Sequence, residues 1–103
     1  MTKSFIKGLL LPLNESLKTA SFADAWDIIS IAEGIFYCIC EYQKKFDFSL
    51  TIKLNGGEEC SIYEVYTLLS KRSIQPRFLQ GVAKQLEDKL LVYLEPHINT
   101  ILK

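Results

Sequence analysis

The hydrophobic pattern changes its period once, near residue 45, and this change limits the folds that the chain can adopt. Between Phe22 and Lys45 the apolar residues recur at helical spacing. From Phe46 onward apolar and polar residues alternate, which is typical of a half-buried strand. The alternating apolar positions are Phe46, Phe48, Leu50, Ile52 and Leu54. Both patterns in direct succession predict a mainly helical chain with some β-structure, an α+β fold.

The alternating segment is followed by a turn and a helix start. Residues 55–57 read Asn-Gly-Gly, a sequence that favours a tight turn. Ser61 and Glu64 have the spacing of a capping box, which predicts a helix over residues 62–72. We therefore expect a short β-hairpin at about 47–61. Two alternatives remain open: the strand pairs with a second copy of the chain, or the fold is an all-α bundle.

The segment from about 22 to 45 is predicted to be a long helix at the centre of a bundle. Its apolar positions cover roughly two-thirds of the circumference at 100° per residue. They include Trp26, Cys38 and Cys40. A helix over 4–19 is expected to kink or break at Pro12, and a last helix is expected from Pro76 to about Glu95.

Length and charge exclude several classes of protein. The chain has 103 residues, with 12 Lys plus Arg against 12 Asp plus Glu. Domains typically hold about 100–150 residues, so we expect one domain over 1–103. Zero net charge argues against holding polyanions by bulk charge.

The number of cysteines indicates a reducing compartment. Three cysteines cannot close a complete set of disulfides. A metal site would need Cys38, Cys40, Cys60 and a further ligand such as His97. Residues two apart on a helix point about 200° away from each other, so no metal is expected.

The apolar stretches are too short for a secretory leader or a membrane span, which predicts a cytoplasmic protein without membrane contact.

The sequence offers little for catalysis. Its only histidine, His97, follows Pro96 near the C-terminus, where we expect it to be exposed and poorly held. We therefore predict no enzymatic activity and no cofactor.

Acidic residues and tyrosine share one strip of the long helix. Residues 21–43 contain four acidic side chains and no basic one. The residues predicted to bind a partner are Asp27, Glu33, Tyr37 and Glu41, extended by Glu58, Glu59 and Tyr63 if the hairpin folds beside the helix. Tyrosine among charged residues is typical of interface anchors. The predicted function is protein binding, to a cationic partner, as in a small cytosolic inhibitor, immunity protein, antitoxin or adaptor; a homodimer is also open.

The alternative function is nucleic-acid binding. Residues 61–95 can be read as a helix-turn-helix unit. The candidate contacts are Lys71, Arg72, Arg77, Gln80 and Lys84. Cations at a helix C-terminus also occur for structural reasons, so protein binding is preferred.

Overall fold

The computed structural model describes residues 2–19, 25–54 and 57–101, and most of them are helical. The long helices are α1 (Thr2–Thr19), α2 (Ala25–Phe46) and α4 (Leu79–Leu94). Strands β1 (Thr51–Lys53) and β2 (Glu59–Ser61) lead into α3 (Ile62–Ser70), and α5 (Ile98–Ile101) closes the chain. Turns of 3₁₀-helix, η3 (Pro76–Phe78) and η4 (Glu95–His97), flank α4. The predicted α+β fold with a hairpin is confirmed.

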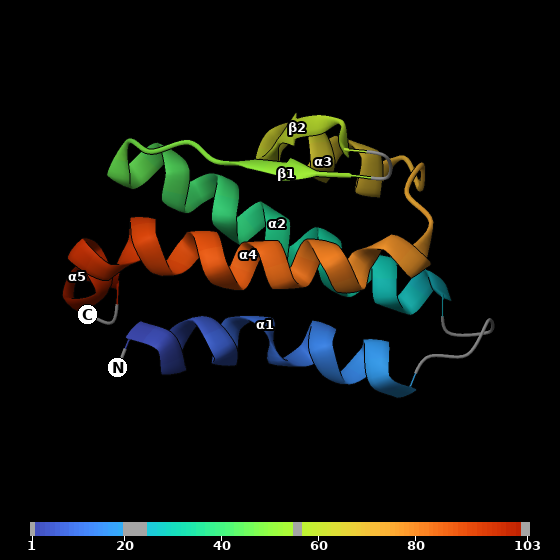
Figure 1. Cartoon of the computed structure of the whole chain (residues 1–103), viewed down its shortest axis with the longest axis horizontal. Helices are drawn as coiled ribbons and strands as arrows, with labels where there is room; N and C mark the ends of the chain where they lie inside the picture. Colours follow the sequence, from blue (N-terminus) through green and yellow to red (C-terminus); the bar gives the residue numbers. More distant parts are fainter. Residues whose placement is uncertain (1, 20–24, 55–56, 102–103) are drawn as a thin grey trace.

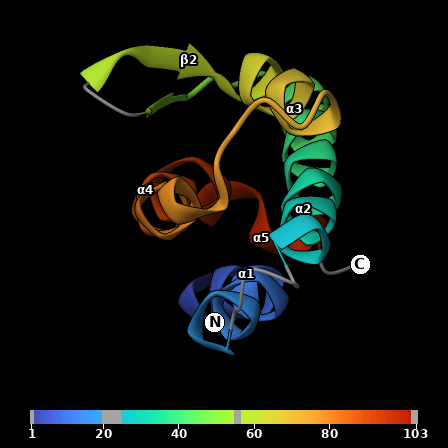
Figure 2. The ribbon, with the colours of Figure 1, turned by 90° about the vertical axis from the view of Figure 1, so that its right-hand side faces the viewer.

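The three long helices lie along the long axis of the molecule (Figure 1). Helix α1 packs against α4 and α2, and α3 packs against α2. Figure 2 shows α4 on one side of the molecule and the α2–α3 pair on the other. The hairpin extends from α3 toward the side of α4.

One hydrophobic cluster joins all these elements. It includes Ile6 and Leu10 of α1, Phe36 of α2 and Leu86 of α4, each with no exposed surface. The radius of gyration is 13.2 Å, close to the roughly 13 Å expected for a compact domain of about 100 residues. The described residues thus form one small compact domain.

Helix α2 is not the enclosed axis that its apolar arc predicted. Trp26 is 56% exposed and Cys38 is also exposed, although both belong to that arc. Other elements cover only part of α2, because the nine-residue α3 is much shorter than α2. The predicted start near Phe22 lies outside the described residues.

The predicted strand is shorter than its alternating pattern. Phe46 is the last residue of α2, which ends where Asp47 adopts a left-handed conformation (φ 50°). The amide of Phe48 then donates to the carbonyl of Gln43 at 3.3 Å. Ladder pairing is confined to Thr51–Lys53 against Glu59–Ser61, in antiparallel register. The Asn55–Gly56 part of the turn lies outside the described residues.

Helix α4 covers the other edge of β1. The side-chain amide of Gln85 accepts from the Lys53 amide and donates to the Lys53 carbonyl, both at 2.8 Å. The Lys89 ammonium donates to the carbonyl of Thr51. Within the described residues, β1 therefore finds its partners inside the chain, on β2 and on α4.

Two prolines lie at or within helices. Helix α1 runs from Thr2 to Thr19 with Pro12 inside it, so the chain does not form two separate helices there. Buried residues on both sides of Pro12, Leu10 and Leu13, anchor the two halves to the same core. Pro76 begins the 3₁₀ turn η3, so the α-helix that was predicted from Pro76 begins three residues later.

Candidate interaction face on α2 and α3

Helices α2 and α3 run side by side in opposite directions, and the contacts along their seam define a register. The hydroxyl of Ser70 donates to Glu33 Oε1 at 2.9 Å. One turn further along α2, the rings of Tyr37 and Tyr66 lie 6.0 Å apart between centroids, tilted by 51°. Since Tyr63 precedes Tyr66 by three residues, the same register places it one turn further still, near Glu41.

Large aromatic side chains are exposed along this seam. Trp26 is 56% exposed, Tyr37 53% and Tyr63 65%, while Tyr66 is half-buried. We call the surface formed by Trp26, Glu33, Tyr37, Glu41, Tyr63 and Tyr66 the α2–α3 face. Exposed aromatic rings with polar neighbours are typical of interfaces, where aromatic residues are enriched.

The N-terminal end of this face holds a cation–π contact. The guanidinium carbon of Arg72 lies 5.3 Å from the centroid of the Trp26 ring. Arg72 has a left-handed backbone (φ 56°), and the amide of Ser73, the next residue, donates to the carbonyl of Leu68 at 2.8 Å. This is the Schellman ending of a helix, at a position that usually carries glycine. An arginine there accepts backbone strain and places its side chain on the indole.

The middle of the face carries acidic side chains and its two ends carry basic ones. Glu33 and Glu41 lie in the middle, whereas Arg72 lies over Trp26 at one end and Lys44 and Lys45 lie in the last turn of α2 at the other. Glu41 makes a solvent-exposed ion pair with Lys44 of the same helix, at 3.7 Å, and such pairs contribute little. Asp27 is exposed about 100° around α2 from Trp26, on the side away from α3.

The structure separates the predicted partner-binding residues into two groups. Glu33, Tyr37, Glu41 and Tyr63 lie on the α2–α3 face, whereas Asp27 lies on the side of α2 away from α3. Glu58 and Glu59 are exposed on the hairpin, which reaches toward α4 and away from α2 (Figure 2). The acidic surface of α2 is therefore not extended by the hairpin.

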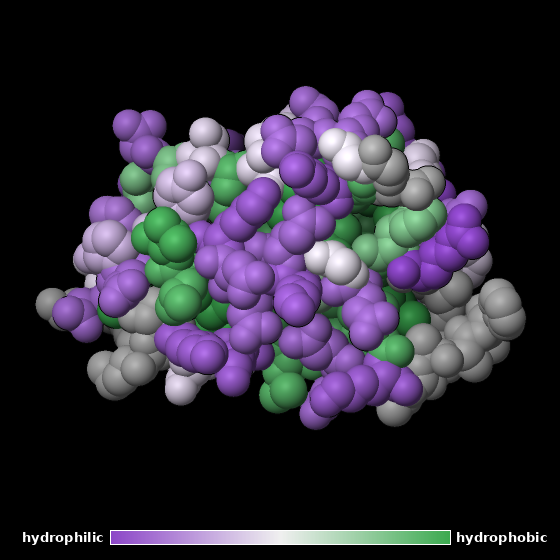
Figure 3. Space-filling model, viewed as in Figure 1, coloured by the Kyte–Doolittle hydropathy of each residue, from purple (hydrophilic) through white to green (hydrophobic). Residues whose placement is uncertain are grey.

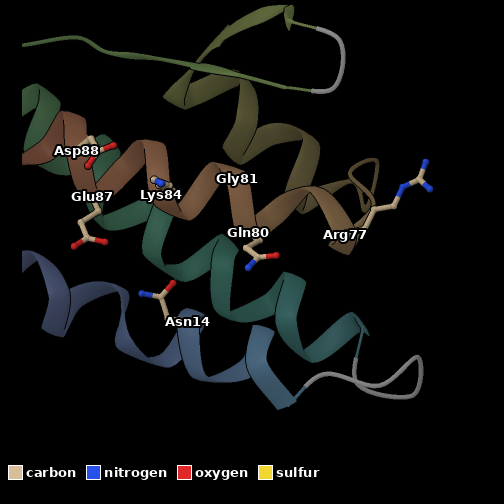
Figure 4. Close-up of a pocket in the computed structure, with 7 residues that line it drawn as sticks. All are labelled: Asn14, Arg77, Gln80, Gly81, Lys84, Glu87 and Asp88. Carbon is tan, nitrogen blue, oxygen red and sulfur yellow. The ribbon is translucent and has the colours of Figure 1, made fainter.

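The residues of the nucleic-acid alternative are exposed but do not form a helix-turn-helix unit. Helix α3 packs mainly against α2, whereas α4 packs mainly against α1. Arg77, Gln80 and Lys84 line a groove between α1 and α4 together with Glu87 and Asp88 (Figure 4). The face over α4 is largely hydrophilic (Figure 3), and its acidic side chains would repel phosphates. Lys71 and Arg72 lie away from this groove, at the C-terminal end of α3. Nucleic-acid binding stays a prediction.

His97 is half-buried, which corrects the expectation that it is exposed. Its ring stacks on Phe46 with centroids 4.4 Å apart and an interplanar angle of 14°. The C-terminal turn is thus packed against the end of α2. The histidine serves this packing contact, because its ring faces an aromatic side chain.

The cysteines differ in burial. Cys38 is exposed, which corrects its placement in the apolar arc of α2, whereas Cys40 and Cys60 are buried. Burial raises the pKa of Cys40, with Lys44 opposing and Glu41 adding to the effect. Burial also raises the pKa of Cys60, and Glu64 and Glu58 raise it further. Among the described residues, no cluster of three or more His, Cys, Asp or Glu side chains could hold a metal ion.

Comparison with known proteins adds no identity to this geometry. The chain matches no known protein family, curated protein or solved structure. In the described part of the chain, no helix combines the length and the apolar character needed to cross a bilayer.

Sequence reasoning missed two residues of the face. Trp26 was assigned to the apolar arc, and Tyr66 was not among the residues predicted to bind a partner. A signal for Trp26 was present in its spacing: Trp26, Glu33 and Tyr37 lie within about 40° on a helical projection. Because this stripe of the helix includes the charged residue Glu33, it indicates that Trp26 lies near the surface.

Proposed function

We propose that this chain is a non-enzymatic module that binds a protein partner through the α2–α3 face. The observation that carries the proposal is the exposure of Trp26, Tyr37 and Tyr63 along one seam that also bears acidic side chains. Exposed aromatic rings gain free energy when a partner covers them, and Trp and Tyr are frequent binding hot spots. The negative charge of both helices favours a cationic partner.

The class of protein that fits is a small cytosolic inhibitor, immunity protein, antitoxin or adaptor. Such proteins act by occupying a surface of their target, and they need a rigid face more than a pocket. Helix α3 is held rigidly on α2, because Ser61 caps it by accepting from the Glu64 amide at 3.1 Å and because Val65 and Leu69 are fully buried. This rigidity lowers the entropy lost on binding.

The experiment compares partner capture from a lysate of the native host by wild-type protein and by variants. Tyr63→Ala and Glu41→Lys are each expected to weaken binding of the captured partner about tenfold, as loss of an interface anchor does. Thermal stability should stay almost unchanged, because both side chains are exposed. Val92→Ala is the matched control, since Val92 is 68% exposed and belongs to α4, which lies on the opposite side of the molecule from α2 and α3 (Figure 2).

Two outcomes would contradict the proposal. In one, the variants of the α2–α3 face capture the partner as well as wild type does. In the other, they lose stability while affinity is retained, which would give the face a structural role.

A further inference from the structure

The α2–α3 face already binds one guanidinium group of its own chain, which indicates that it can bind a guanidinium group of a partner. Arg72 lies over the exposed Trp26 ring at 5.3 Å, within the range of a cation–π interaction. Its side chain comes from a left-handed position where glycine would be less strained. Strain that persists at an exposed position is reason to look for function nearby.

A second place on the same seam has the chemistry for a guanidinium group. Glu33 accepts from Ser70 through one carboxylate oxygen, and a carboxylate can accept several further hydrogen bonds. The ring of Tyr37 follows one turn later on the same side of α2 and is 53% exposed. An aromatic ring beside a carboxylate suits arginine better than lysine, because the planar guanidinium stacks on the ring and donates in its own plane.

The space between Trp26 and Tyr37 is open to a partner. Asp27, Ser30 and Gly34 are the exposed residues of α2 in this interval, and a Cβ placed on Gly34 would meet no atom within 4 Å. A partner segment can therefore approach the backbone of α2 between the two rings.

Charge decides which kind of partner fits. Around Tyr37 the charged side chains of the face are Glu33 and Glu41, while the basic side chains Arg72 and Lys44 lie toward its two ends, so a cationic group is attracted to the middle of the face. A second copy of this chain would bring the same acidic surface against itself, and nucleic acid would bring phosphates. Both are disfavoured by like charge.

We infer that the α2–α3 face binds an arginine-bearing segment of its partner, with a guanidinium group stacked on Tyr37 beside the Glu33 carboxylate. This inference rests on the proposed function and names the chemistry of the partner. Trp26, with Arg72 on its ring, lies about three helical turns from Tyr37, toward the N-terminus of α2.

The single tryptophan of the chain makes the inference directly testable, since its fluorescence reports from within the face. The probes are two alanine-based helical peptides of equal length, one with arginine and one with lysine at every fourth position. The arginine peptide is expected to change Trp26 fluorescence saturably and to bind about fivefold more tightly than the lysine peptide.

Variants locate the site. Tyr37→Ala and Glu33→Gln should each weaken the arginine peptide about fivefold, and Glu33→Gln keeps an acceptor for Ser70. Gly34→Gln should leave the helix intact, because a Cβ at this position meets no atom within 4 Å, and its longer side chain should block the approach. Val92→Ala should bind both peptides as wild type does.

Equal affinity for the two peptides, or no saturable binding of either, overturns the inference, as does binding that Tyr37→Ala leaves unchanged. A saturable fluorescence change with a short DNA duplex at physiological salt would overturn it in favour of nucleic-acid binding. If these results occur while host-partner capture still depends on Tyr63 and Glu41, only the arginine inference fails. If capture is independent of both residues, the proposed function itself fails.

Discussion

At the scale of single residues, burial separates side chains that the sequence presents as equivalent. Cys38 and Cys40 are two residues apart, yet one is exposed and the other is buried. The sequence predicted that they point apart, but not which of them faces solvent. Which of the two cysteines is buried depends on the side of α2 that the neighbouring elements cover, and they leave the side of Cys38 exposed to solvent.

This difference predicts selective thiol chemistry. In the native protein one thiol per chain, Cys38, should react rapidly with a disulfide reagent such as dithionitrobenzoate. Cys40 and Cys60 should react only on unfolding, because they are buried and because burial raises the pKa of both thiols, which lowers the fraction of reactive thiolate.

The control is Cys38→Ser, in which the rapid phase should disappear. Two or three thiols of the native wild-type protein reacting at a common rate would contradict this burial pattern.

At the scale of elements, the boundary between α2 and the hairpin shows the limit of pattern reading. Phe46 belongs by its position both to the helical pattern before it and to the alternating pattern after it. In the structure Phe46 is the last residue of α2, and its ring stacks on His97, which lies 51 residues later in the chain. The choice was therefore made by a distant contact.

The end of α2 also predicts a stabilising substitution. Asp47 has φ 50°, a conformation that glycine adopts without strain, and its charge lies at the negative end of the helix dipole. Asp47→Gly should raise the free energy of unfolding by about 1 kcal/mol, measured by urea denaturation, with part of the gain offset by the freedom of glycine in the unfolded chain.

Asp47→Ala serves as the matched variant. It removes the charge but keeps a Cβ in the left-handed conformation, so it should gain less than Asp47→Gly. An equal gain from both would assign the effect to charge alone, and a loss of stability with Asp47→Gly would show that the left-handed conformation is not strained.

At the scale of the whole molecule, buried groups with raised pKa values couple stability to alkaline pH. Burial raises the pKa of Cys40, of Cys60 and of Tyr42 above their ordinary values. Where the folded pKa exceeds the unfolded pKa, the folded state binds more protons, so stability falls as pH rises between the two values.

We therefore expect the urea midpoint to decline above about pH 9.0, the ordinary pKa of a thiol, and to decline further as the tyrosine ionises. In Cys40→Ala/Cys60→Ala the midpoint will be lower at every pH, but its decline just above pH 9 should be shallower than in wild type. An identical slope in both proteins would exclude the thiols as the cause.

The candidate site was predictable only in part. Spacing alone brought Glu33, Tyr37 and Glu41 to one side of a helix, and the structure keeps them together. Tyr66 and Arg72 could not be added, because their places depend on α3 packing antiparallel to α2. Glu58 and Glu59 were joined to the acidic strip on an assumption about the hairpin, and the pairing of β1 with Gln85 and Lys89 holds it at α4 instead.

The amino-acid sequence by itself determined the order of the helices and the hairpin, because backbone preference and the period of apolar residues act over a few neighbours. It also determined the negative charge of α2 and α3, since charge needs no fold. Only the tertiary structure decided that Trp26 and Cys38 face solvent and that Phe46 ends a helix. The physical reason is that an apolar stripe shows which residues gain from burial, whereas covering them requires elements that lie far away in the chain.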